Sequence, residues 1–178
     1  MPHPKMKLGG IGLAVLCLFA IGAVAGFAQR HFAIASAAAN AARPEVKVLL
    51  AAAVERDNAL VPVEKANLVK AGEVLDWTIN SENVGGSAAM DYKTVSRIPA
   101  GTSFVAGSAK AEGPSKVAFS IDGGKSYAAM PMIDEKQADG TTKKVAAPVS
   151  MYTNVSYQWA DPLAPGGHVT ASYKVLVK

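Results

Sequence analysis

Apolar and polar residues alternate along most of the chain after Pro44, which is the period-2 pattern of half-buried β-strands. The pattern is clearest in residues 169–177, where every odd position is apolar and most even positions are polar. Residues 75–80 and 155–159 alternate in the same way. No segment after residue 60 shows the 3.6-residue apolar repeat of an amphipathic helix. The chain is therefore predicted to be all-β.

Shorter or less regular patterns predict further strands at residues 46–54, 90–98 and 119–121. In the first of these the even positions form one apolar side of an extended segment, although Leu49 and residues 51–53 also fit a helix. Residues 134–150 are polar and irregular, which predicts a long loop or a poorly paired edge.

Glycine and proline separate these segments and predict the turns between them. The turns fall at residues 83–87, 99–101, 122–124 and 162–167. The Asp-Gly-Gly sequence at 122–124 is typical of a β-hairpin, and Tyr127 resumes the alternation after it. Short alternating strands joined by such turns predict an antiparallel β-sandwich.

The first part of the chain has the pattern of an export signal. Lys5 and Lys7 precede a run of 21 uncharged residues, 8–28, and small residues suited to cleavage follow it. The run is also close to the ~20 residues that span a bilayer, so a retained anchor stays open. We therefore expect residues 1–41 to be a signal peptide or N-terminal membrane anchor helix with an alanine-rich linker. Either would place residues 42–178 outside the cytoplasm, in the periplasm, at the cell surface or in the extracellular space.

Charge and cysteine content narrow the function of the exported part. Three of the 18 basic residues lie before residue 42 and no acidic residue does, so the rest carries 15 basic and 14 acidic residues. A near-neutral domain has no general attraction for nucleic acid, and we expect membrane contact only through residues 8–28, if they are retained. The single cysteine, Cys17, lies in the apolar run, so the exported part has no disulfide, thiolate metal site or cysteine nucleophile.

His168 is the one histidine outside the leader and its flank, and it begins the last predicted strand. Its position is in phase with the polar Thr170 and Ser172, which predicts a solvent-facing side chain. A Ser-His-Asp arrangement would need this histidine beside a serine and a buried carboxylate. We therefore expect no catalytic residue and no enzymatic activity.

Two acidic segments are candidate calcium sites, and their role is left open by the sequence. One is Asp122, and the other is the segment 134–139, with Asp134, Glu135 and Asp139. Calcium takes about six to eight oxygen ligands, and the chain lacks the Asp-x-Asp-x-Asp-Gly pattern. Hairpin geometry already explains an Asp-Gly pair. We assign no metal ligand and no cofactor.

Aromatic residues and paired glycines offer two further candidate sites. Trp77, Tyr157, Trp159 and Tyr173 could form a sugar-stacking platform, but each is in phase with aliphatic residues of its strand, which predicts a place in the core. The glycine pairs at 85–86 and 166–167 do not open a helix and lack the Lys-Ser/Thr of a nucleotide loop, so they are predicted turns.

Four motifs occur in a recognisable order. They are AGEVLDWTIN at 71–80, IPAGTSFVAGS at 98–108, FSIDGGKSY at 119–127, and Trp159 followed by LAPGG at 163–167. Together they resemble the conserved repeat domain of bacterial and archaeal surface proteins known as domain of unknown function eleven. The resemblance spans residues 46–178, with Ala71 where a proline is usual and Ser96-Arg97 where Asp-Pro often stands.

This resemblance implies an immunoglobulin-like sandwich with a structural or adhesive role, and it supplies no catalytic residues. We expect an exported, non-catalytic module whose partners are other protein chains, including copies of itself. Edge strands expose backbone groups that can accept a strand from another chain. The alanine-rich segment before Pro44, or the strand from Val46, could be that donor in a filament. The alternative is a soluble glycan- or small-molecule-binding module.

Overall fold

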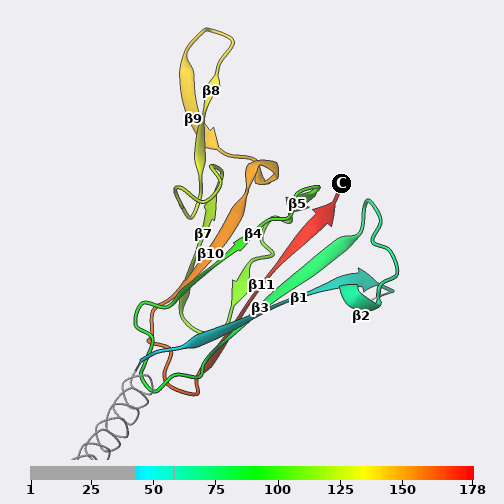
Figure 1. Ribbon diagram of the computed structural model, residues 1–178. Helices are drawn as coiled ribbons and strands as arrows, with labels where there is room; N and C mark the ends of the chain where they lie inside the picture. The colour runs from blue at the N-terminus through cyan, green and yellow to red at the C-terminus, as the bar shows by residue number, and fades with distance from the viewer. Residues whose placement is uncertain (1–42, 58) are drawn as a thin grey trace, which may run out of the picture. The chain divides into compact units, whose positions relative to one another are not determined.

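The computed structural model describes residues 43–57 and 59–178, and the compact unit that begins at Arg43 is all-β, with antiparallel sheets (Figure 1). The predicted leader and its linker, residues 1–41, lie outside the described residues. Within the described part, no helix is long and apolar enough to cross a bilayer.

The larger sheet has six strands in the order β2-β1-β3-β11-β5, and β6 also pairs with β11. Its strands are β1 (Val46–Arg56), β2 (Ala59–Pro62), β3 (Val74–Asn83), β5 (Thr102–Phe104), β6 (Lys110–Ala111) and β11 (His168–Val177). The cleanest alternation in the sequence belongs to β11, which pairs with β3 from His168 to Leu176. β11 lies inside this sheet, between β3 on one side and β5 and β6 on the other, and its alternation gives it one buried face.

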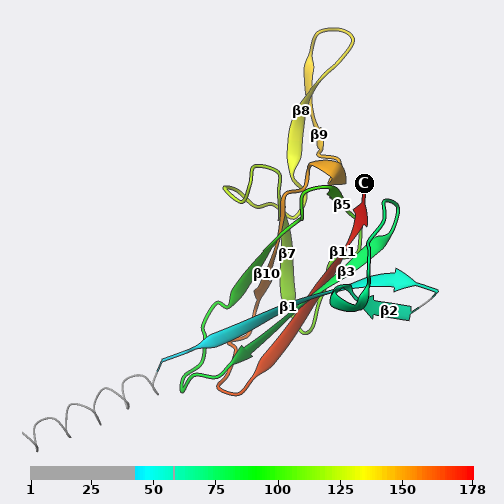
Figure 2. The ribbon, with the colours of Figure 1, turned by 45° about the vertical axis from the view of Figure 1, so that its right-hand side comes forward.

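The smaller sheet has three strands in the order β4-β10-β7. They are β4 (Lys93–Arg97), β7 (Ser115–Ser120) and β10 (Asn154–Trp159). The strands β8 (Met132–Lys136) and β9 (Thr142–Ala146) pair only with each other, and single 3-10 turns lie at η1 (Val63–Lys65) and η2 (Val149–Met151). In both ribbon views the β8–β9 hairpin extends past the two sheets (Figure 1, Figure 2).

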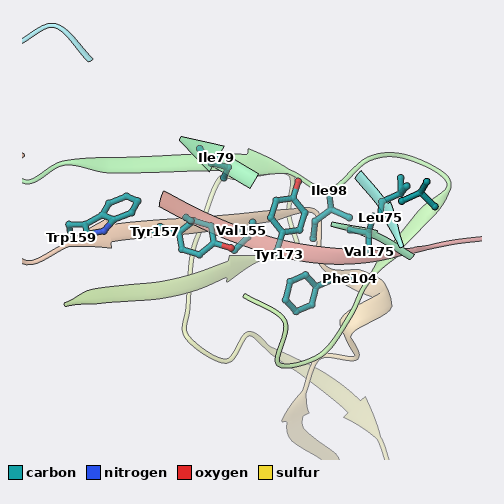
Figure 3. Packing of buried hydrophobic residues seen from close by; sticks show 11 residues of the cluster. Leu75, Ile79, Ile98, Phe104, Val155, Tyr157, Trp159, Tyr173 and Val175 are labelled. Carbon is teal, nitrogen blue, oxygen red and sulfur yellow. The ribbon is translucent and has the colours of Figure 1, made fainter. Parts of the chain in front are cut away.

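The core lies between the two sheets in a sandwich-like arrangement. Ile79 and Tyr173 come from the larger sheet and meet Val155 and Tyr157 of the smaller one (Figure 3). All four point inward because their strands alternate as the sequence predicts. Burial of such side chains is the main term that stabilises a two-layer β fold.

Two buried tyrosine hydroxyls join the sheets. Tyr157 donates to the carbonyl oxygen of Ser172 at 2.7 Å, and the hydroxyl of Tyr173 lies 2.8 Å from Oγ of Ser96. Each bond links a strand of one sheet to a strand of the other. Burial raises the pKa of Tyr157 above its ordinary value, so its hydroxyl stays a neutral donor.

A buried amide holds the start of β1 against the end of β3. The Asn83 side chain is fully buried, and its Oδ1 accepts the backbone N–H groups of Glu45 at 3.2 Å and Gly85 at 3.1 Å. A Cβ atom on Gly85 would lie 2.3 Å from the carbonyl oxygen of Arg43, so only glycine fits there. The loop predicted at 83–87 is confirmed. Its backbone at Gly85 packs directly against residues 43–45, and this contact fixes where β1 begins.

One prediction was wrong and two were only partly right. Residues 134–150 contain most of a paired hairpin, where Asp134 faces Lys144 in an ion pair of 3.1 Å. The strand expected at 90–98 is shorter, because Asp91 has a positive φ of 50° and the chain turns there. The hairpin expected after Phe119 is reduced to a single bridge with Ala128.

Candidate interaction edge

His168 lies where the sequence predicted, exposed on the outer face of β11. Its cross-strand neighbour is Glu82 of β3, which is also exposed. With Lys47 these residues line a shallow outer hollow of about 300 Å³. A catalytic triad requires a buried, oriented carboxylate beside the imidazole, and Glu82 does not have that setting.

The carboxylate of Asp122 is occupied by its own turn. Oδ1 accepts the Ser120 hydroxyl at 2.7 Å and the N–H groups of Lys125 and Ser126 at 3.0 Å, while Oδ2 accepts the Ser126 hydroxyl at 2.6 Å. These bonds, the Ser120 hydroxyl first among them, hold the pKa of Asp122 well below its usual range. The residue therefore acts as the structural lock of the turn that the DGG sequence predicted.

The second acidic segment is also internally paired. Asp134 contacts Lys144 across the hairpin, and Asp139 accepts the backbone N–H of Thr141 at 2.9 Å and its hydroxyl at 2.6 Å. Across residues 43–57 and 59–178, no three side chains of the metal-ligating types lie close enough together to hold an ion. Asp134 and Asp139 thus stabilise the β8–β9 hairpin through contacts within it.

The aromatic residues lie mostly in the core, as predicted. Tyr157, Trp159 and Tyr173 are buried, and Trp159 stacks on Tyr92 with ring centroids 5.5 Å apart. Its Nε1 donates to the carbonyl oxygen of Glu112 at 2.8 Å. Trp77 is only partly buried. A flat aromatic platform open to solvent does not form from these rings.

The edge of β1 is exposed, whereas the sequence predicted only that the strand from Val46 could pair with another chain. β2 pairs with Ala53–Arg56 alone, so among the described residues β1 has no strand neighbour on that side from Val46 to Ala52. The exposed fractions are 54% for Val48, 65% for Leu49 and 48% for Leu50. The described strands of the smaller sheet do not cover this part of the larger one, since the inward-facing side chains of Val48 and Leu50 are about half exposed.

The backbone pattern shows which groups of β1 are free. The carbonyl oxygens of Arg43 and Glu45 accept hydrogen bonds from the N–H groups of Gly86 and Val84. The backbone N–H and C=O groups of the odd-numbered residues of β1 are therefore directed to β3. Because successive residues of a strand direct their N–H and C=O groups to opposite sides, the even-numbered residues point to the open edge. Within residues 43–57 and 59–178, the groups on this side that have no backbone partner are the N–H and C=O of Val46, Val48 and Leu50, together with the N–H of Ala52.

Comparison with family models, with curated proteins and with solved structures finds no match to this chain. Its interaction surfaces must therefore be judged from their own geometry.

The edges formed by β4, β2, β5 and β6 carry features that discourage pairing. On β4, the residues with outward backbone groups are Lys93, Val95 and Arg97, so two positive charges flank one valine. β2 has four residues and ends in Pro62, and β5 and β6 are shorter still. Charge, proline and shortness are the usual protections of sheet edges. The edge of β1 has a single charge, Lys47, in its free segment.

A second surface lies on the outer face of the smaller sheet. A hollow of about 430 Å³ is lined by Lys93, Lys116, Tyr127 and Gln158. The Lys93 ammonium lies 4.7 Å from the centre of the Tyr127 ring, a cation–π distance. Hydrogen-bond donors around an aromatic ring are suited to a polar small molecule or a sugar.

Proposed function

We propose that this chain is an exported, non-catalytic module with an immunoglobulin-like sandwich fold that acts in structure or adhesion at the cell envelope or in the extracellular space. It works by pairing an edge strand with another protein chain. The observation that carries the proposal is the apolar edge of β1 from Val46 to Ala52, which has no strand partner within residues 43–57 and 59–178. An exposed edge of this kind is a template for an added strand.

The fold class and the export rest on separate support. Two facing antiparallel sheets with a shared core agree with an immunoglobulin-like sandwich. The four ordered motifs and the resemblance they carry point to the same fold and to a surface location. The basic start and apolar run before residue 29 support export.

Export is tested by fractionating cells that make the native chain and measuring its mass in each compartment. We expect the protein outside the cytoplasm, with its N-terminal residues removed at least through residue 28. An intact Met1 outside the cytoplasm would mean a retained anchor. A chain confined to the cytoplasm would overturn the proposal.

Assembly is tested by light scattering and electron microscopy of the purified chain over a range of concentrations, alone and with native envelope extract. Particle size should grow with concentration or with extract. A monomer under all these conditions would contradict a structural role.

The alternative function is a binding module for a glycan or small molecule, and the hollow beside Tyr127 favours it. Tyr127→Ala should abolish any saturable glycan binding by the chain, and circular dichroism and thermal melting check that this variant is folded. Binding that survives in the Tyr127 variant would exclude this hollow.

A further inference from the structure

We propose that two copies of this chain pair antiparallel through the free edges of β1, about a two-fold axis at Val48, and so join their larger sheets into one. This inference rests on the proposed function and names its partner as a second copy. A two-fold contact uses the same patch on both copies, which requires the patch to be complementary to itself. The edge of β1 meets this requirement in length, hydrogen bonding and charge.

The length of the free edge sets where the axis lies. The backbone bends at Arg43, and β2 begins to occupy the edge at Ala53, opposite Pro62. The straight, open segment between them runs over residues 44–52, and its midpoint is Val48. With the axis there, Arg43 of one copy comes opposite Ala53 of the other, so the paired segment ends where the backbone bends and β2 begins.

Hydrogen bonding agrees with this register. Val48 faces Val48 of the second copy, and Val46 faces Leu50, so residues with outward N–H and C=O groups meet residues of the same kind. In an antiparallel sheet, such a pair exchanges two hydrogen bonds. Pro44, which has no N–H, faces Ala52 and still offers its carbonyl oxygen.

The side chains of β1 are also compatible with an axis at Val48. The half-exposed valines and leucines of the inner face pack against one another, which removes apolar surface from water. On the outer face Lys47 lies opposite Leu49 of the second copy. An axis at Lys47 would place two ammonium groups directly opposite, which destabilises a strand pair. An axis at Leu49 would force Glu45 into the place of Pro62.

The sharpest test is a proline at the axis. The N–H of Val48 points to the open edge and takes no part in the β1–β3 ladder, so Val48→Pro should leave the monomer folded. The matched control is Val95→Pro, because Val95 is 44% exposed and its N–H also points to an open edge, that of β4. Circular dichroism and thermal melting of both variants check that each is folded.

Sedimentation equilibrium of the full chain and both variants measures the dimer dissociation constant. We expect equal constants for the unmodified chain and Val95→Pro, and at least a tenfold weaker dimer for Val48→Pro, since two central hydrogen bonds are lost. An unmodified chain that stays monomeric, or a Val48 variant that dimerises as well as the control, would overturn the inference.

Cysteine crosslinking tests the register, in a Cys17→Ser background. The Cα atoms of a hydrogen-bonded antiparallel pair are about 5.5 Å apart, within disulfide range. Val48→Cys should therefore crosslink to itself. Leu50→Cys should not, because its two copies would lie roughly 13 Å apart along the strands. The opposite result would move the axis and contradict the register.

These outcomes separate the inference from the proposed function. Assembly that persists unchanged in Val48→Pro would remove β1 as the interface and leave a structural role through another surface. A cytoplasmic chain that still dimerises through Val48 would remove the proposed function and leave the interface.

Discussion

The side-chain amide of Asn83 donates a 2.8 Å hydrogen bond to the carbonyl oxygen of Leu163, 80 positions further along the chain. The same amide nitrogen donates to Ser87 at 2.8 Å, and its oxygen accepts from Glu45 and Gly85. One buried side chain thus connects the start of β1, the loop after β3 and the turn before β11. All four hydrogen-bonding positions of the amide are used, which is what burial of such a group demands.

Asn83→Ala should therefore destabilise the fold by about 2–4 kcal/mol, because one buried and three part-buried backbone groups lose this hydrogen-bond partner. Urea unfolding followed by fluorescence measures the change. Asn80→Ala is the matched control, since Asn80 lies three residues earlier in β3 with an exposed side chain, and its cost should stay below about 0.5 kcal/mol. Equal effects for the two variants would show that the amide is not a structural hub.

The two tryptophans should respond differently to replacement by phenylalanine. Trp159 donates its N–H to Glu112, whereas the buried Nε1 of Trp77 has no partner among the described residues. Trp159→Phe should cost about 1–2 kcal/mol, because it removes the donor to the part-buried carbonyl of Glu112. Trp77→Phe should cost less than about 1 kcal/mol, because no hydrogen bond is lost. Thermal melts of both variants give the order, and the reverse order would refute this account.

The sequence pattern was sufficient to predict which side chains of a strand are buried where one face of the strand lies in the core and the other is exposed to solvent. The phase of β3, β10 and β11, and with it the burial of Tyr157 and Tyr173, follows from alternation alone. The β8–β9 hairpin was missed because both of its faces are exposed, so pairing depends on cross-strand contacts such as Asp134 with Lys144.

The candidate interaction edge was only partly predictable. Its alternation correctly placed Val48 and Leu50 on the inner face, but their exposure depends on how many strands the opposite sheet has. That is a property of the tertiary fold. A signal was present, however, because residues 48–54 are apolar at every position. An edge strand with two apolar faces is unusual and indicates a contact surface.

Acid should weaken the fold partly through Glu73. Its carboxylate forms bonds of 2.7 and 3.0 Å with Arg56 and accepts the Lys70 N–H at 2.6 Å. The Arg56 guanidinium first, and then the Lys70 N–H, lower the pKa of Glu73 from 4.5 to about 2. A carboxyl group with a lowered folded-state pKa stabilises the fold above its unfolded pKa and loses that contribution as the pH falls toward the folded value.

The stability of the unmodified chain should therefore fall between pH 4.5 and about 2, and Glu73→Gln should fall less steeply over that interval. Urea midpoints at a series of pH values measure both slopes. Arg56→Met, which removes the same ion pair from the other side, should also flatten the profile. Parallel profiles for all three proteins would show that this pair does not contribute.

Loss of the imidazole of His168 should have little effect. The side chain is exposed on β11 and its strand neighbour Glu82 is exposed as well. His168→Ala should change the free energy of unfolding by less than about 0.5 kcal/mol and leave assembly intact. A folded His168 variant that failed to assemble would show that the imidazole has a direct role.

The order of strands in the larger sheet determines how the domain would carry tension. β1 and β11 flank β3, and both run antiparallel to it, so the first residue of β1 and the last residue of β11 lie at opposite ends of the sheet (Figure 1). A pull on Arg43 and Lys178 is then directed along the strands and loads both ladders in shear. Because ladder hydrogen bonds lie across the strands, they must yield together rather than one after another. A domain pulled at Arg43 and Lys178 would therefore resist unfolding, because the force along the strands must break many hydrogen bonds at once.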